Sequence, residues 1–202
     1  MLLCDIGNTS YHFLDDERDY KESVATFDPQ TITEDVYYIS VNSSVSKRLA
    51  AAPNWINIET FLDRSDYYES MGVDRVVACE GISDGVIVDA GSAITVDVVK
   101  KSHFMGGFIY PGINAMASTY KTISPALAYS FNFDIAIQKL PKNSQDAISY
   151  GFLKLLKSEV DSYRLPIILT GGDAEHLKAL FPEAKIDKLL LFESMKKLII
   201  KL

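Results

Sequence analysis

The 202-residue sequence has few cysteines, no long apolar run and no excess of positive charge. Its two cysteines, Cys4 and Cys79, lack the spacing of a zinc site, so we expect both to be buried small side chains. No apolar run could cross a bilayer and no signal segment follows Met1, which favours a cytoplasmic protein with no membrane partner. The net charge of −7, without a stripe of Lys and Arg, argues against nucleic acid as a partner.

The sequence alternates between predicted strands and predicted helices, and one strand pattern occurs twice. The apolar run in "MLLCDIGNTS" ends in Asp5, Gly7 and polar residues, and "VIVDAGSAITVD" repeats this ending at Asp89, 84 residues later. A third apolar run, "LPIILTGGD", also ends in glycines. We interpret the repeat as a duplicated α/β domain, residues 1–84 and 85–202, with a cleft shared by the two copies.

The repeated strand endings carry the residues expected around a bound anion. In open α/β sheets, ligands bind beyond the carboxyl ends of the strands. Gly7 and Gly91 would let the main chain approach a bulky anion without a Cβ in the way. Asn8, Thr9 and Ser92 then offer donors to phosphate oxygens. The two loops therefore predict a phosphate site.

A carboxylate in each loop would repel phosphate unless a cation lies between them. Mg²⁺ is commonly held by one or two carboxylates, several waters and substrate phosphates. We therefore expect Asp5 and Asp89 to position hydrated Mg²⁺ on a triphosphate, with the segment from Thr170 to Asp173 under the nucleoside. A single D-x-G after a strand is usually only a tight turn, so this prediction depends on its recurrence.

The segment "GVDR", from Gly72 to Arg75, has two interpretations. It can be ordinary helix N-terminal chemistry, with Asp74 near the positive end of the helix dipole. At a cleft, the same carboxylate could accept a hydroxyl proton while Arg75 holds an anionic group.

Six motifs in this order resemble the type III pantothenate kinases, of the acetate and sugar kinase, Hsp70 and actin superfamily. The motifs are D-x-G-N-T at 5–9, G-x-D-R at 72–75, D-x-G-[ST]-A at 89–93, G-G-x-I-x-P-G at 106–112, N-[ST]-x-x-A-I-x-x-G at 143–151 and T-G-G at 170–172. The resemblance implies ATP-dependent phosphorylation of pantothenate to 4′-phosphopantothenate, the first step of coenzyme A synthesis. It also implies an α/β fold of two RNase H-like (actin-like ATPase) domains with mixed sheets flanking a nucleotide cleft, a homodimer, Mg²⁺, and K⁺ or ammonium.

The resemblance assigns roles to individual positions. It implies that Asp74 is the general base and that Asp5 and Asp89 hold Mg²⁺. The residues implied to bind ATP are Asp5, Gly7, Asn8, Thr9, Asp89, Gly91, Ser92, Gly171 and Gly172. Those implied around pantothenate are Tyr67, Gly72, Arg75, Gly107 and Ser144.

The chain departs from the family pattern before G-x-D-R. Ser65 stands where the family usually has a tyrosine, and Tyr67 or Tyr68 can substitute for it. The helix expected after Pro111 places Ile113 and Met116 on one face, which is either packing within the subunit or, as the resemblance favours, a dimer contact. A monovalent cation is expected nearby, with Asp97 as its ligand.

Two other functions compete with this interpretation. One is another small-molecule kinase on the same scaffold, which would differ in the acceptor consumed with ATP. The other is a non-enzymatic accessory factor for transcription, against which the acidic composition argues.

Overall fold

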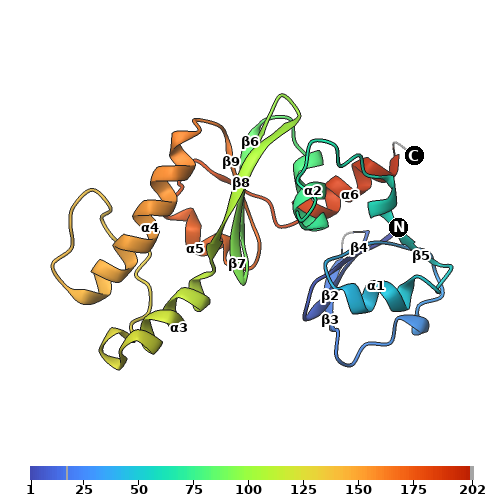
Figure 1. The fold of residues 1–202 in the computed structure, drawn as a ribbon, viewed down its shortest axis with the longest axis horizontal. Coiled ribbons are helices and arrows are strands. Elements are labelled where there is room, and N and C mark those ends of the chain that lie inside the picture. The colour runs from blue at the N-terminus through green and yellow to red at the C-terminus, as the bar shows by residue number, and fades with distance from the viewer. Residues whose placement is uncertain (17, 201–202) are drawn as a thin grey trace. The chain divides into compact units, whose positions relative to one another are not determined.

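Two five-stranded mixed sheets, one in each of two compact units, form the framework of the protein (Figure 1). The computed structural model describes residues 1–16 and 18–200. Unit 1 comprises Met1–Gly81 and Leu189–Leu202, and unit 2 comprises Ile82–Lys188. The predicted α/β class is confirmed.

Unit 1 is built on a sheet in the order β3-β2-β1-β4-β5. Its elements are β1 (Leu2–Ile6), β2 (Ser10–Asp15), β3 (Arg18–Ser23), η1 (Pro29–Thr31), β4 (Val36–Ser40), α1 (Ser43–Leu49), β5 (Trp55–Asn57), η2 (Ile58–Phe61), α2 (Val73–Glu80) and α6 (Leu190–Ile200). The central strand β1 is antiparallel to β2 and parallel to β4. Because strand side chains alternate, Cys4 packs with the α1 face of the core and Leu3 with the α2 and α6 face.

Unit 2 repeats this topology in the order β10-β9-β6-β7-β8. Its elements are β6 (Gly85–Ala90), β7 (Ala93–Lys100), β8 (His103–Pro111), α3 (Ile113–Ile123), η3 (Pro125–Leu127), α4 (Ser144–Ser162), β9 (Ile167–Thr170), α5 (Ala174–Lys178) and β10 (Lys185–Ile186). The central strand β6 is antiparallel to β7 and parallel to β9, as β1 is to β2 and β4. Figure 1 shows α4 and α5 on the same side of this sheet, and Phe152 and Leu177 from these helices belong to one core cluster.

The C-terminal helix α6 belongs to the first unit, although the sequence-based division placed residues 85–202 together. Phe192 and Met195 of α6 are buried in one cluster with Leu3, Val73 and Val77. This face of the first sheet would otherwise expose apolar side chains to water, so the end of the chain returns to cover it. The predicted boundary near residue 84 lies close to the junction at Gly81 and Ile82.

Two smaller expectations concern α3 and the cysteines. Ile113 is buried in the hydrophobic core of unit 2, and Met116 packs against this core, so both residues contribute to packing within the subunit. Cys4 and Cys79 are buried, as predicted. Among the described residues, no helix has the combined length and apolar character needed to cross a membrane.

Candidate functional site

The first repeated loop joins β1 to β2 and presents polar residues at the surface. The Gly7 N–H donates to the Ser10 carbonyl at 3.0 Å, which closes the turn and leaves Asn8 and Thr9 exposed. A Cβ built on Gly7 would meet only the Ser10 oxygen at 3.7 Å, an ordinary contact. Packing in the fold therefore does not require glycine at this position.

The structure brings the G-x-D-R segment to the same edge of the first sheet as this loop. Val41, directly after β4, donates its N–H to the Ile6 carbonyl at the end of β1. A Cβ on Gly72 would lie 3.8 Å from the Val41 side chain and 2.4 Å from Asp74 Oδ1. Asp74 thus occupies the space that a side chain at position 72 would fill, and it lies in the first turn of α2.

Tyr68 and Tyr67 differ in what their hydroxyl groups contact. The Tyr68 hydroxyl lies 2.5 Å from Arg75 Nη1, and the buried guanidinium lies over the Tyr68 ring at 5.8 Å. The Tyr67 hydroxyl instead donates to Glu80 Oε1 at 2.8 Å, and burial together with this carboxylate raises the pKa of Tyr67 far above its usual value. Tyr68, which contacts Arg75, is exposed, whereas Tyr67 is half-buried.

The second repeated loop, between β6 and β7, is built on a close backbone contact. The Gly91 N–H donates to the Ala93 carbonyl at 3.0 Å, and Ser92 is exposed at the tip. A Cβ on Gly112, the N-cap of α3, would lie 2.2 Å from the Ser92 carbonyl oxygen and 2.6 Å from that of Gly91. Gly112 therefore supports this loop, a role that its place in a motif did not reveal.

The T-G-G segment packs directly on Asp89 within unit 2. Thr170 pairs with Asp89 in the parallel register of β9 and β6. Gly171 has φ of +85°, and a Cβ there would lie 2.3 Å from Asp89 Oδ1 and 2.6 Å from the Ala90 carbonyl oxygen. A Cβ on Gly172 would meet nothing within 4 Å. The carboxyl ends of β6 and β9 thus bring the second D-x-G loop and the glycine pair together.

Each unit contributes one half-buried strand-end carboxylate, Asp5 in unit 1 and Asp89 in unit 2. Within residues 1–16 and 18–200, no cluster of three or more Asp, Glu, His or Cys side chains could enclose a metal ion. Asp97 is buried on β7, where it pairs in register with Gly107 of β8. A single carboxylate is a donor that hydrated Mg²⁺ uses when phosphates complete its coordination, so Asp5 and Asp89 each suit that ion.

Ser144 lies at the exposed first position of α4. The preceding Asn143 caps the helix by accepting the Asp146 N–H at 2.9 Å and by donating its own amide to Asp146 Oδ2 at 2.7 Å. The amides of Asn132 and Asn143 lower the pKa of the Asp146 carboxyl. This cap fixes where α4 begins and holds the backbone at Ser144 in place.

The comparisons with known proteins agree along the whole chain. The sequence model of the family described as type III pantothenate kinase matches residues 38–164. A type III pantothenate kinase of Sulfurimonas denitrificans is 55% identical over 201 residues, which cover 100% of this chain and 98% of that protein. One from Campylobacter jejuni is 40% identical over 203 residues, covering 98% of this chain and 96% of that protein.

Two solved structures share the fold. One from Campylobacter jejuni, described as a candidate transcriptional activator of the Baf family, superposes with a TM-score of 0.90 at 38% identity, covering 100% of this chain and 98% of that one. A candidate 2-dehydro-3-deoxygalactonokinase from Sinorhizobium meliloti gives a TM-score of 0.57 at 8% identity, covering 100% and 96%. The second likeness concerns the fold alone.

Proposed function

The chain belongs to the type III pantothenate kinases, and from this premise we propose how its residues divide the work of the reaction. It phosphorylates pantothenate with ATP, a step of coenzyme A synthesis. The observation that carries this activity is the 55% identity with a type III pantothenate kinase along the whole chain. The residue roles rest on the recurrence of D-x-G at the carboxyl ends of β1 and β6.

The two D-x-G loops bind the phosphates of ATP in this proposal. Asn8, Thr9 and Ser92 are exposed beside backbone that carries no side chain at Gly7 and Gly91, which suits donation to phosphate oxygens. Asp5 and Asp89 would hold Mg²⁺, which would supply positive charge beside the transferring phosphate. Gly171 and Gly172 follow β9 beside Asp89 and bind the nucleoside.

Asp74 acts as the general base in this proposal. Its Oδ1 accepts a hydrogen bond from the backbone N–H of Arg75 at 2.9 Å, which orients the carboxylate. In the described part of the chain, Oδ2 has no hydrogen-bond partner. That free oxygen can accept the proton of the pantothenate hydroxyl as the phosphate is transferred. Arg75, held by the Tyr68 hydroxyl, offers its guanidinium to the anionic group of the substrate.

The acceptor site includes Gly72, Gly107 and Ser144 in addition to Arg75. Gly72 leaves room for the Asp74 carboxylate at the N-terminus of α2, and Ser144 is exposed at the start of α4. Tyr68 takes the place of the family tyrosine in our proposal, because the Tyr67 hydroxyl is already bonded to Glu80.

Replacing Asp74 by Asn tests the base directly. We expect Asp74→Asn to bind ATP normally and to lose kcat by roughly 10²–10⁴, the range for removal of a general base. Glu69→Gln, which removes an exposed acidic charge five residues away, is the matched control and should leave kcat unchanged. If Asp74→Asn kept kcat within a few-fold and raised only KM for pantothenate, Asp74 would be a binding residue.

A monovalent cation, a homodimer and a cytoplasmic location complete the proposal. The buried carboxylate of Asp97 supports a role in holding K⁺ or ammonium. Exposed apolar residues support self-association, since Met105 and Ile109 on the edge strand β8 and Ile123 at the end of α3 are all more than half exposed. A monomer in light scattering at micromolar concentration, fully active without K⁺ or ammonium, would contradict both the dimer and the cation.

A role in transcription is the second candidate, because the 38% identical Campylobacter jejuni structure carries that description. The net charge of −7 disfavours direct contact with a phosphate backbone. A gel-shift titration with duplex DNA at low salt separates the two, since the kinase proposal predicts no retained complex.

A further inference from the structure

A pocket in unit 1 lies apart from the strand-end loops that bind ATP in the proposal above. Its volume is about 270 Å³. The lining residues are Pro29, Gln30, Ile32, Arg48, Leu49, Ala51, Ala52, Pro53 and Asn54. They come from η1 and the segment after it, from the last turn of α1, and from the loop that leads into β5. The volume is close to the lower end of small-molecule sites.

The pocket and the D-x-G loop lie at opposite ends of the first sheet. Asn54 accepts the N–H of Val36 with its backbone carbonyl at 2.8 Å, so the pocket borders the beginning of β4. Gly7 instead follows the end of β1, where Ile6 pairs with Ser40 at the end of β4. The strand from Val36 to Ser40 is about 13 Å long at the usual rise per residue. A ligand in the pocket would therefore leave the loop after β1 accessible.

The walls of this pocket are already fixed by hydrogen bonds. The Asn54 side-chain amide donates to the carbonyls of Ile32 and Glu34 at 2.9 and 3.0 Å. The indole N–H of Trp55 donates to the Pro29 carbonyl at 3.3 Å. A preformed site loses little conformational freedom when a ligand binds, so even a small ligand can have measurable affinity.

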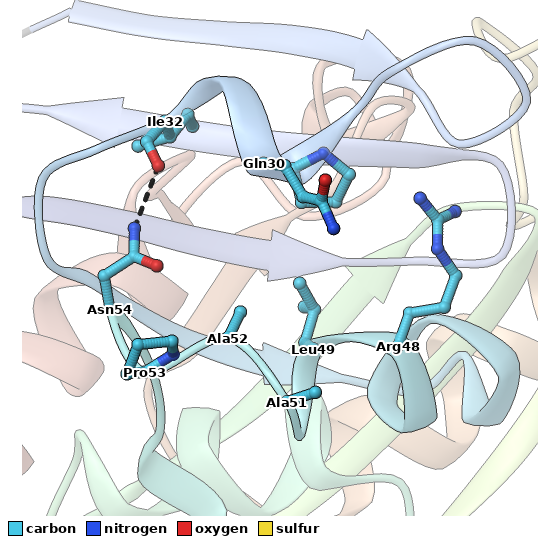
Figure 2. A pocket seen from close by; sticks show the side chains of 9 residues that line it. Gln30, Ile32, Arg48, Leu49, Ala51, Ala52, Pro53 and Asn54 are labelled. Atoms are coloured by element: carbon cyan, nitrogen blue, oxygen red, sulfur yellow. Dashed lines mark hydrogen bonds between the residues drawn. The ribbon is translucent and has the colours of Figure 1, made fainter.

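Two polar side chains at the pocket are available to a ligand. Figure 2 shows the Gln30 amide above Leu49 and the Arg48 guanidinium to the right of both. Within the described residues, the Arg48 side chain makes no ion pair or hydrogen bond. Burial raises the pKa of the Tyr11 phenol, and the positive charge of Arg48 opposes that rise. The charge of Arg48 therefore acts on the buried side chains next to the pocket. Asp28, the nearby acid, accepts the Gln30 backbone N–H at 3.1 Å.

We propose that this pocket is a second small-molecule site, which takes a small amphipathic anion. A carboxylate or phosphate head group would accept hydrogen bonds from Arg48 and Gln30, and a short apolar chain would lie on Leu49, Ala52 and Pro53. The guanidinium fork fits both kinds of head group, so the experiment must separate them.

The chain carries its own reporter for this site. Trp55 is its single tryptophan, it is buried, and its indole N–H bonds the carbonyl of the pocket residue Pro29. We would titrate the protein with butyl phosphate, butyrate and butanol, each in the presence of saturating ADP and pantothenate, a pair that the enzyme does not turn over. Trp55 fluorescence and the backbone amide NMR shifts of residues 48–52 and Asn54 would both be followed.

We expect butyl phosphate or butyrate to bind saturably, and butanol to bind at least tenfold more weakly. The anion that binds more tightly identifies the head group. Arg48→Gln should weaken anion binding about tenfold or more, because a charged donor is lost while a neutral polar side chain remains. Lys47→Gln, a neighbouring exposed cation that does not line the pocket, should bind as the wild type does. Ala51→Leu, at an exposed position of the wall, should block binding without disturbing the core.

Three results would overturn the proposal. The first is the absence of saturation by either anion up to about 10 mM in both fluorescence and NMR, an affinity too weak for a built site. The second is a signal that appears without substrates but is lost when ADP and pantothenate are saturating, which would place the anion at the substrate loops. The third is equal binding by wild type and Arg48→Gln.

Discussion

Replacing Gly171 by alanine should destabilise unit 2 through the packing of the T-G-G segment on Asp89. Gly171 has φ of +85°, a backbone conformation that is strained for residues with a Cβ. The new Cβ would also lie 2.3 Å from Asp89 Oδ1 and 2.6 Å from the Ala90 carbonyl oxygen. The Asp89 carboxylate can rotate away, but the Ala90 carbonyl is part of the sheet and cannot.

The two effects can be given magnitudes. Unfavourable φ costs about 1–3 kcal/mol and overpacking about the same, so we expect a loss of about 3 kcal/mol in the free energy of unfolding. For a chain of this size that loss corresponds to a decrease in Tm of about 6–12 °C. Because Asp89 must move, turnover at low Mg²⁺ should fall as well. Thermal and urea denaturation followed by circular dichroism would measure the stability.

Gly172→Ala is the matched control for this experiment. A Cβ at Gly172 meets nothing within 4 Å, so its stability should stay within about 0.5 kcal/mol of the wild type. Activity of Gly172→Ala can fall, since Gly172 is proposed to bind the nucleoside, but its Tm should not. A Tm of Gly171→Ala within about 1 °C of the wild type would refute the close packing of Gly171 on Asp89.

Three further predictions concern the metal, the acceptor and the core. Asp5→Asn and Asp89→Asn should each reduce turnover strongly and leave the fold intact, because each removes a charge but no volume; near-normal turnover of either variant at low Mg²⁺ would contradict the assignment. Tyr68→Phe should raise KM for pantothenate about tenfold through the lost bond to the guanidinium, while Tyr67→Phe should leave that KM unchanged; equal effects on KM would argue against the distinction. Tyr11→Phe should be neutral or stabilise the fold by up to about 1 kcal/mol, because the buried Tyr11 hydroxyl has no hydrogen-bond partner among the described residues; a loss above that amount in urea denaturation would show that it does have one.

The duplicated fold could be predicted because its signal is local. Asp5 and Asp89 each end a short apolar strand, and strand endings with glycine and polar residues are visible in a single sequence. The position of α6 could not be predicted, because an amphipathic helix at the end of a chain does not specify which apolar face it covers. Only the packing of Phe192 beside Leu3 shows this.

The candidate site was predicted in its residue types more completely than in its contacts. The motifs point to Asp74, Arg75 and the glycines as candidates, because the six motifs follow one another in a fixed order along the chain. The choice between Tyr67 and Tyr68 depends on which hydroxyl the fold bonds to Glu80, and two adjacent tyrosines look alike in a sequence. Gly112 was overlooked as a support for the loop at Ser92, because the contact joins segments 20 residues apart.

The most direct test of the account measures ADP release with pantothenate as the acceptor. Purified protein would be incubated with ATP, Mg²⁺, K⁺ and pantothenate, with parallel reactions that contain a sugar acid or no acceptor. The account predicts ADP release that depends on pantothenate, together with an equal amount of product heavier than pantothenate by one phosphate group. ADP release that is independent of pantothenate, or faster with the sugar acid, would contradict it.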